Sequence, residues 1–275
     1  GTRVIAGVLL FAGCVRRLCP DPNVGLLLPT SSGGVIANLA VLLCGKAVVN
    51  LNYTASKEAI SAAITRAGIR NVISSKRFLE RLAKRGLNLE PILSGVRLHS
   101  MEDLAAGMSS TRRMVALVQA VLFPAWLLRA LYCRRMPLDS PAAILFSSGS
   151  EGEPKGVVLS HRNMMANLKQ TSDVLNTETS DVIMATLPLF HAFGLTVTTL
   201  MPMVEGIPVI CHPDPTDAVG VARAVATYEA TILCGTSTFL RLYAKNNRVD
   251  PLMFDSLRLV VAGAEKLAAD VRESF

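Results

Sequence analysis

The sequence predicts a layered α/β fold in which mostly parallel sheets are flanked by helices. Short apolar runs alternate with helical segments, and turns rich in glycine and serine follow several of these runs, as expected of parallel sheets. Hydrophobic residues make up 51% of the 275 positions, enough to bury a large core. We therefore expect a globular chain of one large domain or two smaller ones.

Residues 1–110 are expected to form a first α/β portion. Its predicted elements are an amphipathic helix at 1–19, a strand at 24–28, a helix at 35–44, a strand at 47–50, a helix at 56–67, a strand at 71–74 and a basic helix at 76–85. The first strand, helix and strand form a βαβ unit of a parallel sheet. Residues 87–139 break this rhythm, and Glu102 and Asp103 are placed in a turn.

An apolar helical insert is predicted at 111–136. Residues 115–132 are almost wholly apolar and are bracketed by arginine pairs; as one helix they would reach about 27 Å, close to the hydrocarbon thickness of a bilayer. Gln119, Pro124 and Arg129 argue against a true span. We interpret the run as a helix or helical hairpin that lies in the membrane interface.

A membrane surface is therefore a predicted partner of this insert. Residues 112–135 would contact it, with Trp126 and Tyr132 at the depth of the headgroups. A buried helical insert is the main alternative, and a transmembrane helix is a third.

The second α/β portion, at 137–275, is expected to carry the chemistry. Strands are predicted at 142–146, 157–159, 181–187, 207–211, 231–234 and 257–262, and helices at 162–175, 218–229 and 240–244. The loop between the first two strands gathers small and hydroxyl residues around one basic side chain, namely Ser147, Ser148, Gly149, Ser150, Gly152, Lys155 and Gly156. Backbone N–H groups in such a loop turn toward an anion, and the ammonium adds a point charge. The loop is therefore predicted to hold phosphate.

This stretch resembles the phosphate loop of the adenylate-forming superfamily, which includes acyl-CoA synthetases, luciferases and peptide-synthetase adenylation domains. The positions that match are Phe146, Ser148, Gly149, Ser150, Gly152, Pro154, Lys155 and Gly156. Ser147 replaces a threonine, and Glu151 puts a carboxylate where a hydroxyl is usual, which is unfavourable beside a triphosphate unless it faces away or meets a cation. The resemblance implies that residues 147–152 and Lys155 bind ATP together with Mg²⁺, and that Lys155 is also catalytic.

A second motif, LPLFHAFG at 187–194, follows the strand predicted at 181–187. Ligands of parallel sheets bind beyond the carboxyl ends of the strands, where His191 falls. The segment resembles the Pro-Leu-Phe-His-x-x-Gly motif of the same superfamily. That resemblance implies a catalytic His191 beside the phosphates and the carboxylate, and it places Phe193 and Gly194 in the acyl site.

A third motif is the turn after the strand predicted at 257–262. It resembles the superfamily turn that lies against the adenine ring. The implied neighbours of the adenine are Gly263, Ala264, Glu265 and Lys266, with Gly263 allowing a close approach of the backbone.

Two other segments carry weaker signals. His212 and Asp217 have the spacing of the glycerolipid acyltransferase dyad, but the prolines between them indicate a rigid surface turn instead. Residues 236–238 are small enough to line an acyl tunnel, and they are equally compatible with the start of a helix.

The composition of the chain limits which binding partners and which cellular compartment are expected. A formal charge of +7 and scattered aromatic residues, at 5%, argue against a nucleic-acid surface. Six cysteines without a CxxC spacing indicate free thiols in a reducing compartment, with no metal site. No secretion signal is visible. We expect the cytoplasmic face of a bacterial inner membrane.

The three motifs occur in the order of the superfamily and span nearly the whole chain. Their sequences resemble those of the synthetase half of the bacterial bifunctional 2-acylglycerophosphoethanolamine acyltransferases/acyl-ACP synthetases. This implies activation of a fatty acid by ATP and its transfer to acyl carrier protein, in the recycling of phospholipid acyl chains. Residues 1–275 then represent a truncated, partial AMP-binding N-terminal domain that we expect to be inactive alone. A long-chain acyl-CoA synthetase, with CoA as acceptor, and a non-catalytic lipid- or membrane-binding module are the alternatives.

Overall fold

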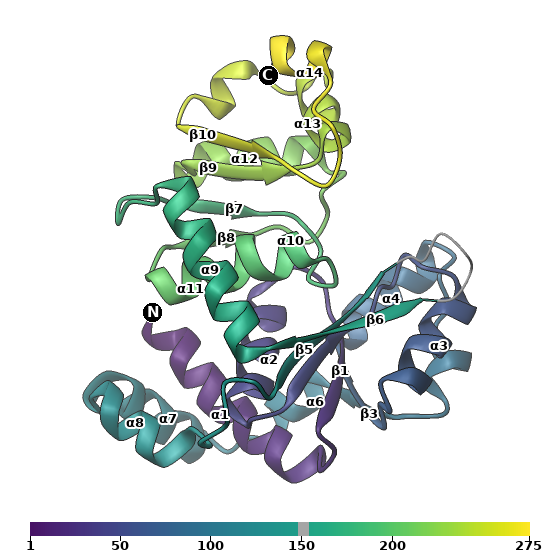
Figure 1. Ribbon diagram of the computed structural model, residues 1–275, viewed down its shortest axis with the longest axis vertical. Coiled ribbons are helices and arrows are strands. Elements are labelled where there is room, and N and C mark those ends of the chain that lie inside the picture. The colour runs from purple at the N-terminus through teal and green to yellow at the C-terminus, as the bar shows by residue number, and fades with distance from the viewer. Residues whose placement is uncertain (148–153) are drawn as a thin grey trace. The chain divides into compact units, whose positions relative to one another are not determined.

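The computed structural model describes residues 1–147 and 154–275, and the chain divides into two compact units (Figure 1). The first unit comprises Gly1–Leu28 and Ser32–Met164, and the second comprises Pro29–Ser31 and Met165–Phe275. In each unit the described strands form a parallel or mainly parallel sheet with helices beside it. The predicted layered α/β fold is confirmed.

The first unit contains a six-stranded sheet with the order β4-β3-β1-β2-β5-β6. Its strands are β1 (Asn23–Leu27), β2 (Ala47–Asn50), β3 (Asn71–Ser74), β4 (Arg97–Ser100), β5 (Pro141–Ser147) and β6 (Lys155–Ser160). Only β6, which pairs with β5, runs antiparallel. Strands β2 and β3 are buried along their whole length, as is usual where helices cover both faces of a parallel sheet. The predicted βαβ unit corresponds to β1, α2 (Ser32–Leu43) and β2.

The other helices of this unit are α1 (Thr2–Leu18), α3 (Lys57–Arg66), α4 (Lys76–Lys84), α5 (Glu90–Leu93), α6 (Met101–Ala106), α7 (Ser110–Leu122) and α8 (Ala125–Tyr132). Serine hydroxyls cap the first turn of four of these helices, of which α3 and α4 are examples. Ser56 accepts a hydrogen bond from the N–H of Ala59 at the start of α3, and Ser75 accepts one from Phe78 at the start of α4. These bonds satisfy N–H groups that a helix leaves without an internal partner.

The second unit contains a four-stranded parallel sheet with the order β10-β9-β7-β8. Its strands are β7 (Ile183–Ala185), β8 (Val209–Cys211), β9 (Ile232–Gly235) and β10 (Leu259–Ala262). Its helical segments are most of α9 (His161–Leu175), α10 (Ala192–Leu195), a π-helical turn at Thr196–Leu200, α11 (Met201–Glu205), α12 (Ala218–Tyr228), α13 (Ser237–Ala244), a 3₁₀ turn at Pro251–Phe254 and α14 (Ala269–Ser274).

Residues 87–106 hold regular structure that the sequence reasoning missed. Strand β4 extends the first sheet as its edge, and its polar, partly exposed residues lack the alternation that marks a strand. Glu102 and Asp103 do not sit in a turn; they lie in the first turn of α6. Burial raises the pKa of Glu102, but hydrogen bonds from the hydroxyls of Ser75 and Ser100 and from backbone N–H groups outweigh it and lower the pKa to about 2.

The apolar insert is a helical hairpin. Helices α7 and α8 are separated at Pro124, which cannot continue α7 because it lacks an N–H donor. Most of the large apolar side chains of the hairpin are exposed rather than buried, so the alternative of a buried insert is wrong. Throughout the described part of the chain, none of the helices has both the length and the apolar character that crossing a bilayer requires.

The structure divides the chain at a different place from the boundaries expected at 110 and 136. Strands β5 and β6, which flank the predicted phosphate loop, belong to the first unit because β5 pairs with β2. The change of unit falls inside α9, after Met164. Pairing between strands about ninety residues apart leaves no mark in the local pattern of the sequence.

Candidate functional site

The second unit brings two of the predicted motifs to one edge of its sheet. Because β7, β9 and β10 are parallel, their carboxyl ends point the same way. His191 follows β7, Thr236 follows β9 and Gly263 follows β10. This edge is where ligands of parallel sheets bind.

His191 stands immediately before α10, at its N-cap position, and its side chain makes no capping hydrogen bond. Its ring lies 4.5 Å from that of Phe190, centroid to centroid, at an angle of 57°. Desolvation by the surrounding protein lowers the pKa of His191 below its ordinary value, although one side of the residue is open to solvent. The imidazole is therefore neutral near pH 7 and can accept a proton or a hydrogen bond.

Gly194 is required by the packing of the backbone around it. A Cβ at this position would lie 2.1 Å from the carbonyl oxygen of Pro188 and 2.9 Å from that of Leu187. Real Cβ atoms do not approach so closely, so no other residue fits here without a shift of the chain. The glycine lets α10 start directly after the turn, which fixes where His191 and Phe193 stand.

Phe193 and Gly263 connect the two motifs. A Cβ on Gly263 would lie 2.7 Å from Cε1 of Phe193, so the aromatic ring rests on the bare backbone of the third motif. The close approach that Gly263 was predicted to offer a nucleotide is made here by Phe193. The two segments are seventy positions apart in the sequence, and their contact brings the second and third motifs together.

The turn after β10 is held by specific contacts. The N–H of Gly263 donates to the carbonyl oxygen of Gly235 at 3.0 Å. Ala264 adopts a φ of 66°, a left-handed conformation that costs a residue with a Cβ about 1 kcal/mol or more. Exposed Ala264 and Lys266 project from the turn. The strained Ala264 fits a turn whose shape is set by its neighbours.

Glu265 fastens this turn to the start of α13. Its carboxylate accepts hydrogen bonds from the N–H of Thr238 at 2.5 Å and from the Thr238 hydroxyl at 3.2 Å. The bond from the Thr238 N–H is the main reason why the pKa of Glu265 is lowered. Thr236 caps α13 and Ser237 accepts a bond from Ala268. Of the two interpretations left open for residues 236–238, the structure therefore favours the start of a helix.

The first unit carries the β5–β6 hairpin of the phosphate motif. Ser147 and Lys155 are paired across the hairpin, and the Ser147 hydroxyl donates to the carbonyl oxygen of Lys155 at 3.5 Å. Both residues are exposed. The remaining predicted phosphate ligands, Ser148, Gly149, Ser150, Glu151 and Gly152, lie outside the described residues.

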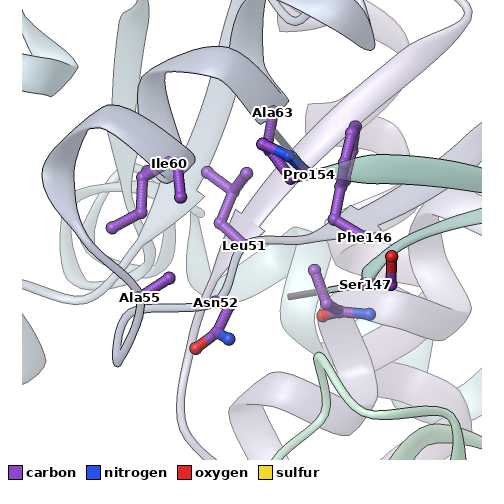
Figure 2. Close-up of a pocket in the computed structure, with 10 residues that line it drawn as sticks. Leu51, Asn52, Ala55, Ile60, Ala63, Phe146, Ser147 and Pro154 are labelled. Atoms are coloured by element: carbon purple, nitrogen blue, oxygen red, sulfur yellow. The ribbon is translucent and has the colours of Figure 1, made fainter. Parts of the chain in front are cut away.

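A small pocket beside this hairpin was not expected from the sequence. Figure 2 shows its lining, with Phe146, Ser147 and Pro154 of the hairpin opposite the segment that follows β2. That segment supplies Leu51, Asn52, Ala55 and Ile60. The pocket's volume of about 50 Å³ is too small for a nucleotide. The pocket lies beyond the carboxyl end of β2, and the pairing of β2 with β5 that creates it is not visible in the sequence.

His212 and Asp217 lie near each other, and both form hydrogen bonds within the predicted turn and the start of α12. Their closest side-chain atoms, Nε2 and Oδ2, are 3.5 Å apart. Asp217 accepts a hydrogen bond from the N–H of Gly220 and caps α12, and His212 Nδ1 contacts the backbone of Asp214. These bonds to the backbone are those expected of the rigid surface turn.

The chain belongs to the family of AMP-binding enzymes, whose family model matches residues 6–275. A long-chain-fatty-acid–CoA ligase from Yersinia pestis is 27% identical to it over 275 aligned residues, which cover 92% of this chain and 48% of that protein. The chain thus spans about half the length of the curated relatives it matches.

Solved structures agree on the fold. ATP-bound MatB from Rhodopseudomonas palustris superposes with a TM-score of 0.72 at 22% identity, covering 99% of this chain and 50% of that one. The N-terminal domain of FACL13 from Mycobacterium tuberculosis gives 0.77 at 18% identity, covering 99% and 64%. The predicted N-terminal adenylate-forming fold is confirmed.

Proposed function

We propose that this chain is the nucleotide- and carboxylate-binding part of an ATP-dependent, AMP-forming ligase that activates fatty acids. The observation that carries the proposal is the contact between Phe193 and Gly263, which joins the acyl and adenine motifs at the ligand-binding edge of a parallel sheet. Membership of the AMP-binding family supports the nucleotide, and the names of curated relatives support the fatty acid.

Each motif has a role in this proposal. Lys155, Ser147 and the rest of the loop at 147–152 would bind the phosphates of ATP. Lys155 would offset charge that grows on the departing pyrophosphate, a task that Mg²⁺ bound to the phosphates would share. The turn at 263–266 would face the adenine, and neutral His191 would orient the carboxylate at the α-phosphate, with Phe193 and Gly194 shaping the acyl site.

Residues present in the structure fit such a ligand. Lys155 is exposed at the start of β6, free of a carboxylate among the described residues, so its ammonium is available to phosphate. Within the same described ranges, no group of three or more His, Cys, Asp or Glu side chains could hold a metal ion, so Mg²⁺ would arrive with the nucleotide.

The thiol acceptor has two candidates. CoA is favoured by the names of the related ligases. Acyl carrier protein is favoured by the sequences of the motifs. This acceptor would connect the enzyme with phospholipid recycling at the inner face of a bacterial membrane. Supplying the full-length protein with palmitate, ATP and either acceptor decides between them: the correct acceptor yields a thioester, and the other yields none.

The test of the proposal is ATP–pyrophosphate exchange by the full-length protein. We expect exchange with palmitate, little with acetate, and at least a tenfold loss in the His191→Ala variant. Absence of exchange with any carboxylate contradicts the proposal. The second candidate function, a non-catalytic lipid-binding module, is favoured by the exposed apolar side chains of α7 and α8; palmitate binding that is independent of ATP, without exchange, would support it.

A further inference from the structure

Helix α7 presents its apolar stripe to solvent. Met114, Leu117, Val118 and Val121 recur at the spacing of one helix face, yet they are 61, 39, 42 and 61% exposed. The opposite face carries Ala116, the one residue of α7 that is buried, and it packs against α1. Helices of globular proteins usually turn such a stripe toward the core, so this stripe requires a partner.

The apolar area continues onto α8. Leu122, at the end of α7, and Trp126 and Leu131, on α8, are 70, 70 and 55% exposed, so large apolar side chains face solvent on both sides of the break at Pro124. Figure 1 shows α7 and α8 together at the same side of the first unit as α1. Isolated exposed apolar residues are common, but these seven large ones within two successive helices indicate an interaction surface.

Contacts on the inner side hold the hairpin in place. The Tyr132 hydroxyl donates to Oε1 of Gln119 at 2.6 Å, which ties α8 to α7. The Arg16 guanidinium, on α1, donates to the carbonyl oxygen of Tyr132 and lies 5.9 Å from the centre of its ring. Tyr132 therefore does not point its hydroxyl to headgroups as predicted, and Trp126 is the aromatic residue that faces outward.

Charge is distributed as unevenly as apolar area. Residues 1–20 and 104–138, which contain these three helices, have no Asp, Glu or Lys and carry eight arginines, Arg3, Arg16, Arg17, Arg112, Arg113, Arg129, Arg134 and Arg135. All eight are exposed. The other 20 basic and 21 acidic residues of the chain leave a net charge of −1, so the whole excess of positive charge belongs to this surface.

We propose that α1, α7 and α8 form a basic apolar surface that docks on an anionic lipid bilayer. Arginines without neighbouring carboxylates match anionic headgroups, and the exposed Leu122 and Trp126 enter the boundary with the acyl chains. A second copy of the chain would oppose eight positive charges to eight more. A nucleic acid would leave the apolar stripe in water. An anionic bilayer matches both the arginines and the exposed apolar side chains. It is also where a long-chain acid dissolves.

The experiment uses Trp126, the only tryptophan of the chain, as the reporter. Its fluorescence is followed while phosphatidylcholine vesicles, with or without phosphatidylglycerol, are added to the chain. We expect a blue shift and quenching by brominated acyl chains with the anionic vesicles, and a binding constant at least tenfold weaker without phosphatidylglycerol. Equal binding to both kinds of vesicle, or no shift with either, overturns the proposal.

Matched variants locate the surface. Leu122→Glu is expected to weaken binding at least tenfold, whereas Val174→Glu, at a residue of α9 that is 83% exposed, leaves it unchanged. Arg129→Gln together with Arg135→Gln should weaken it about 25-fold, at about fivefold for each arginine. The control pair, Arg77→Gln with Arg81→Gln on α4, keeps the wild-type affinity. Equal effects of test and control variants contradict the proposal.

Two further experiments test whether the surface binds a different partner. Sedimentation without lipid is expected to give a monomer; a dimer that Leu122→Glu dissociates would assign the surface to a second copy and overturn the bilayer. Binding of an oligonucleotide that competes fully with vesicles and is insensitive to Leu122→Glu would overturn it as well. None of these measurements involves catalysis, so they test bilayer binding independently of the proposed ligase activity.

Discussion

The candidate ligand-binding residues of the two units are held in different ways. In the second unit, Gly194, Gly263 and Glu265 are each fixed by a close contact with Pro188, Phe193 or Thr238. In the first unit, Ser147 and Lys155 stand exposed on a hairpin at the edge of a sheet, joined by one long hydrogen bond. The motif residues of the second unit are packed into its fold, whereas the Lys155 side chain is exposed.

This difference predicts that substitutions in the two units affect different properties, namely stability and nucleotide binding. Substitutions in the second unit's motifs are expected to lower the free energy of unfolding, because their neighbours are packed against them. Substitutions at the hairpin are expected to change nucleotide affinity and leave unfolding untouched. Preorganised groups of the first kind position a ligand at little entropic cost, while an exposed lysine contributes through its charge.

The largest expected effect is that of Gly194→Ala. The new Cβ would clash with the carbonyl oxygen of Pro188, 2.1 Å away, and the backbone cannot yield as a side chain can. We expect the free energy of unfolding to fall by about 3 kcal/mol or more, measured by urea denaturation. Gly13→Ala, in α1 and with open space around its Cα, is the control and should be neutral or slightly stabilising. A loss under about 1 kcal/mol would show that the turn is not rigid.

The ion pair of Asp181 with Arg258 comes next. Asp181, whose side chain is 1% exposed, accepts hydrogen bonds from Arg258 and from the Thr231 hydroxyl, and the Arg258 bonds are the main cause that lowers its pKa to about 2. A lowered pKa stabilises the fold above the unfolded value of 3.8. That contribution, about 2 kcal/mol, is lost as pH falls from about 4 toward 2. Unfolding measured along this range should show the loss.

Asp181→Asn is the matching variant. It removes the charge that Arg258 meets, so stability should fall at neutral pH by about 2 to 3 kcal/mol and its dependence on acid pH should flatten. A variant that keeps the wild-type pH profile would assign the acid sensitivity to other carboxylates, such as Glu102, whose pKa is also about 2.

A double-mutant cycle tests the contact between the motifs. Gly263→Ala places a Cβ against the ring of Phe193, which is the end of a side chain and can shift, so the cost should be about 1 to 2 kcal/mol. In a Phe193→Ala background the same change should cost much less, giving a coupling energy of about 1 kcal/mol. Additive costs would mean that the two residues do not share the contact on which the proposed site rests.

The sequence predicted the central strands well because their apolar runs are short and bounded by turns. Strands at 47–50 and 71–74 were predicted with the bounds of β2 and β3. Strand β4 was missed because an exposed edge strand needs no apolar alternation. The motifs singled out Phe193 and Gly263 separately, but no pattern indicated that Phe193 occupies the space above Gly263. Such a contact depends on tertiary packing.

The insert illustrates the same limit. Its composition predicted helices and a break at Pro124, and it left open whether they are buried. The exposed stripe of α7 became visible only once Ala116 was seen to face α1. Which face of a largely apolar helix turns inward is decided by its neighbour, and a local pattern does not contain that information.

The most direct test of the account is the affinity for ATP of Lys155→Ala beside its stability. Titration calorimetry with ATP and Mg²⁺ should give a Kd about 10 to 100 times weaker than that of the wild type, as expected when one charged contact to phosphate is lost. The free energy of unfolding should stay within about 0.5 kcal/mol, and the control Lys84→Ala, on α4, should match the wild type in both. An unchanged Kd in Lys155→Ala would contradict the assignment of the hairpin to the phosphates of ATP.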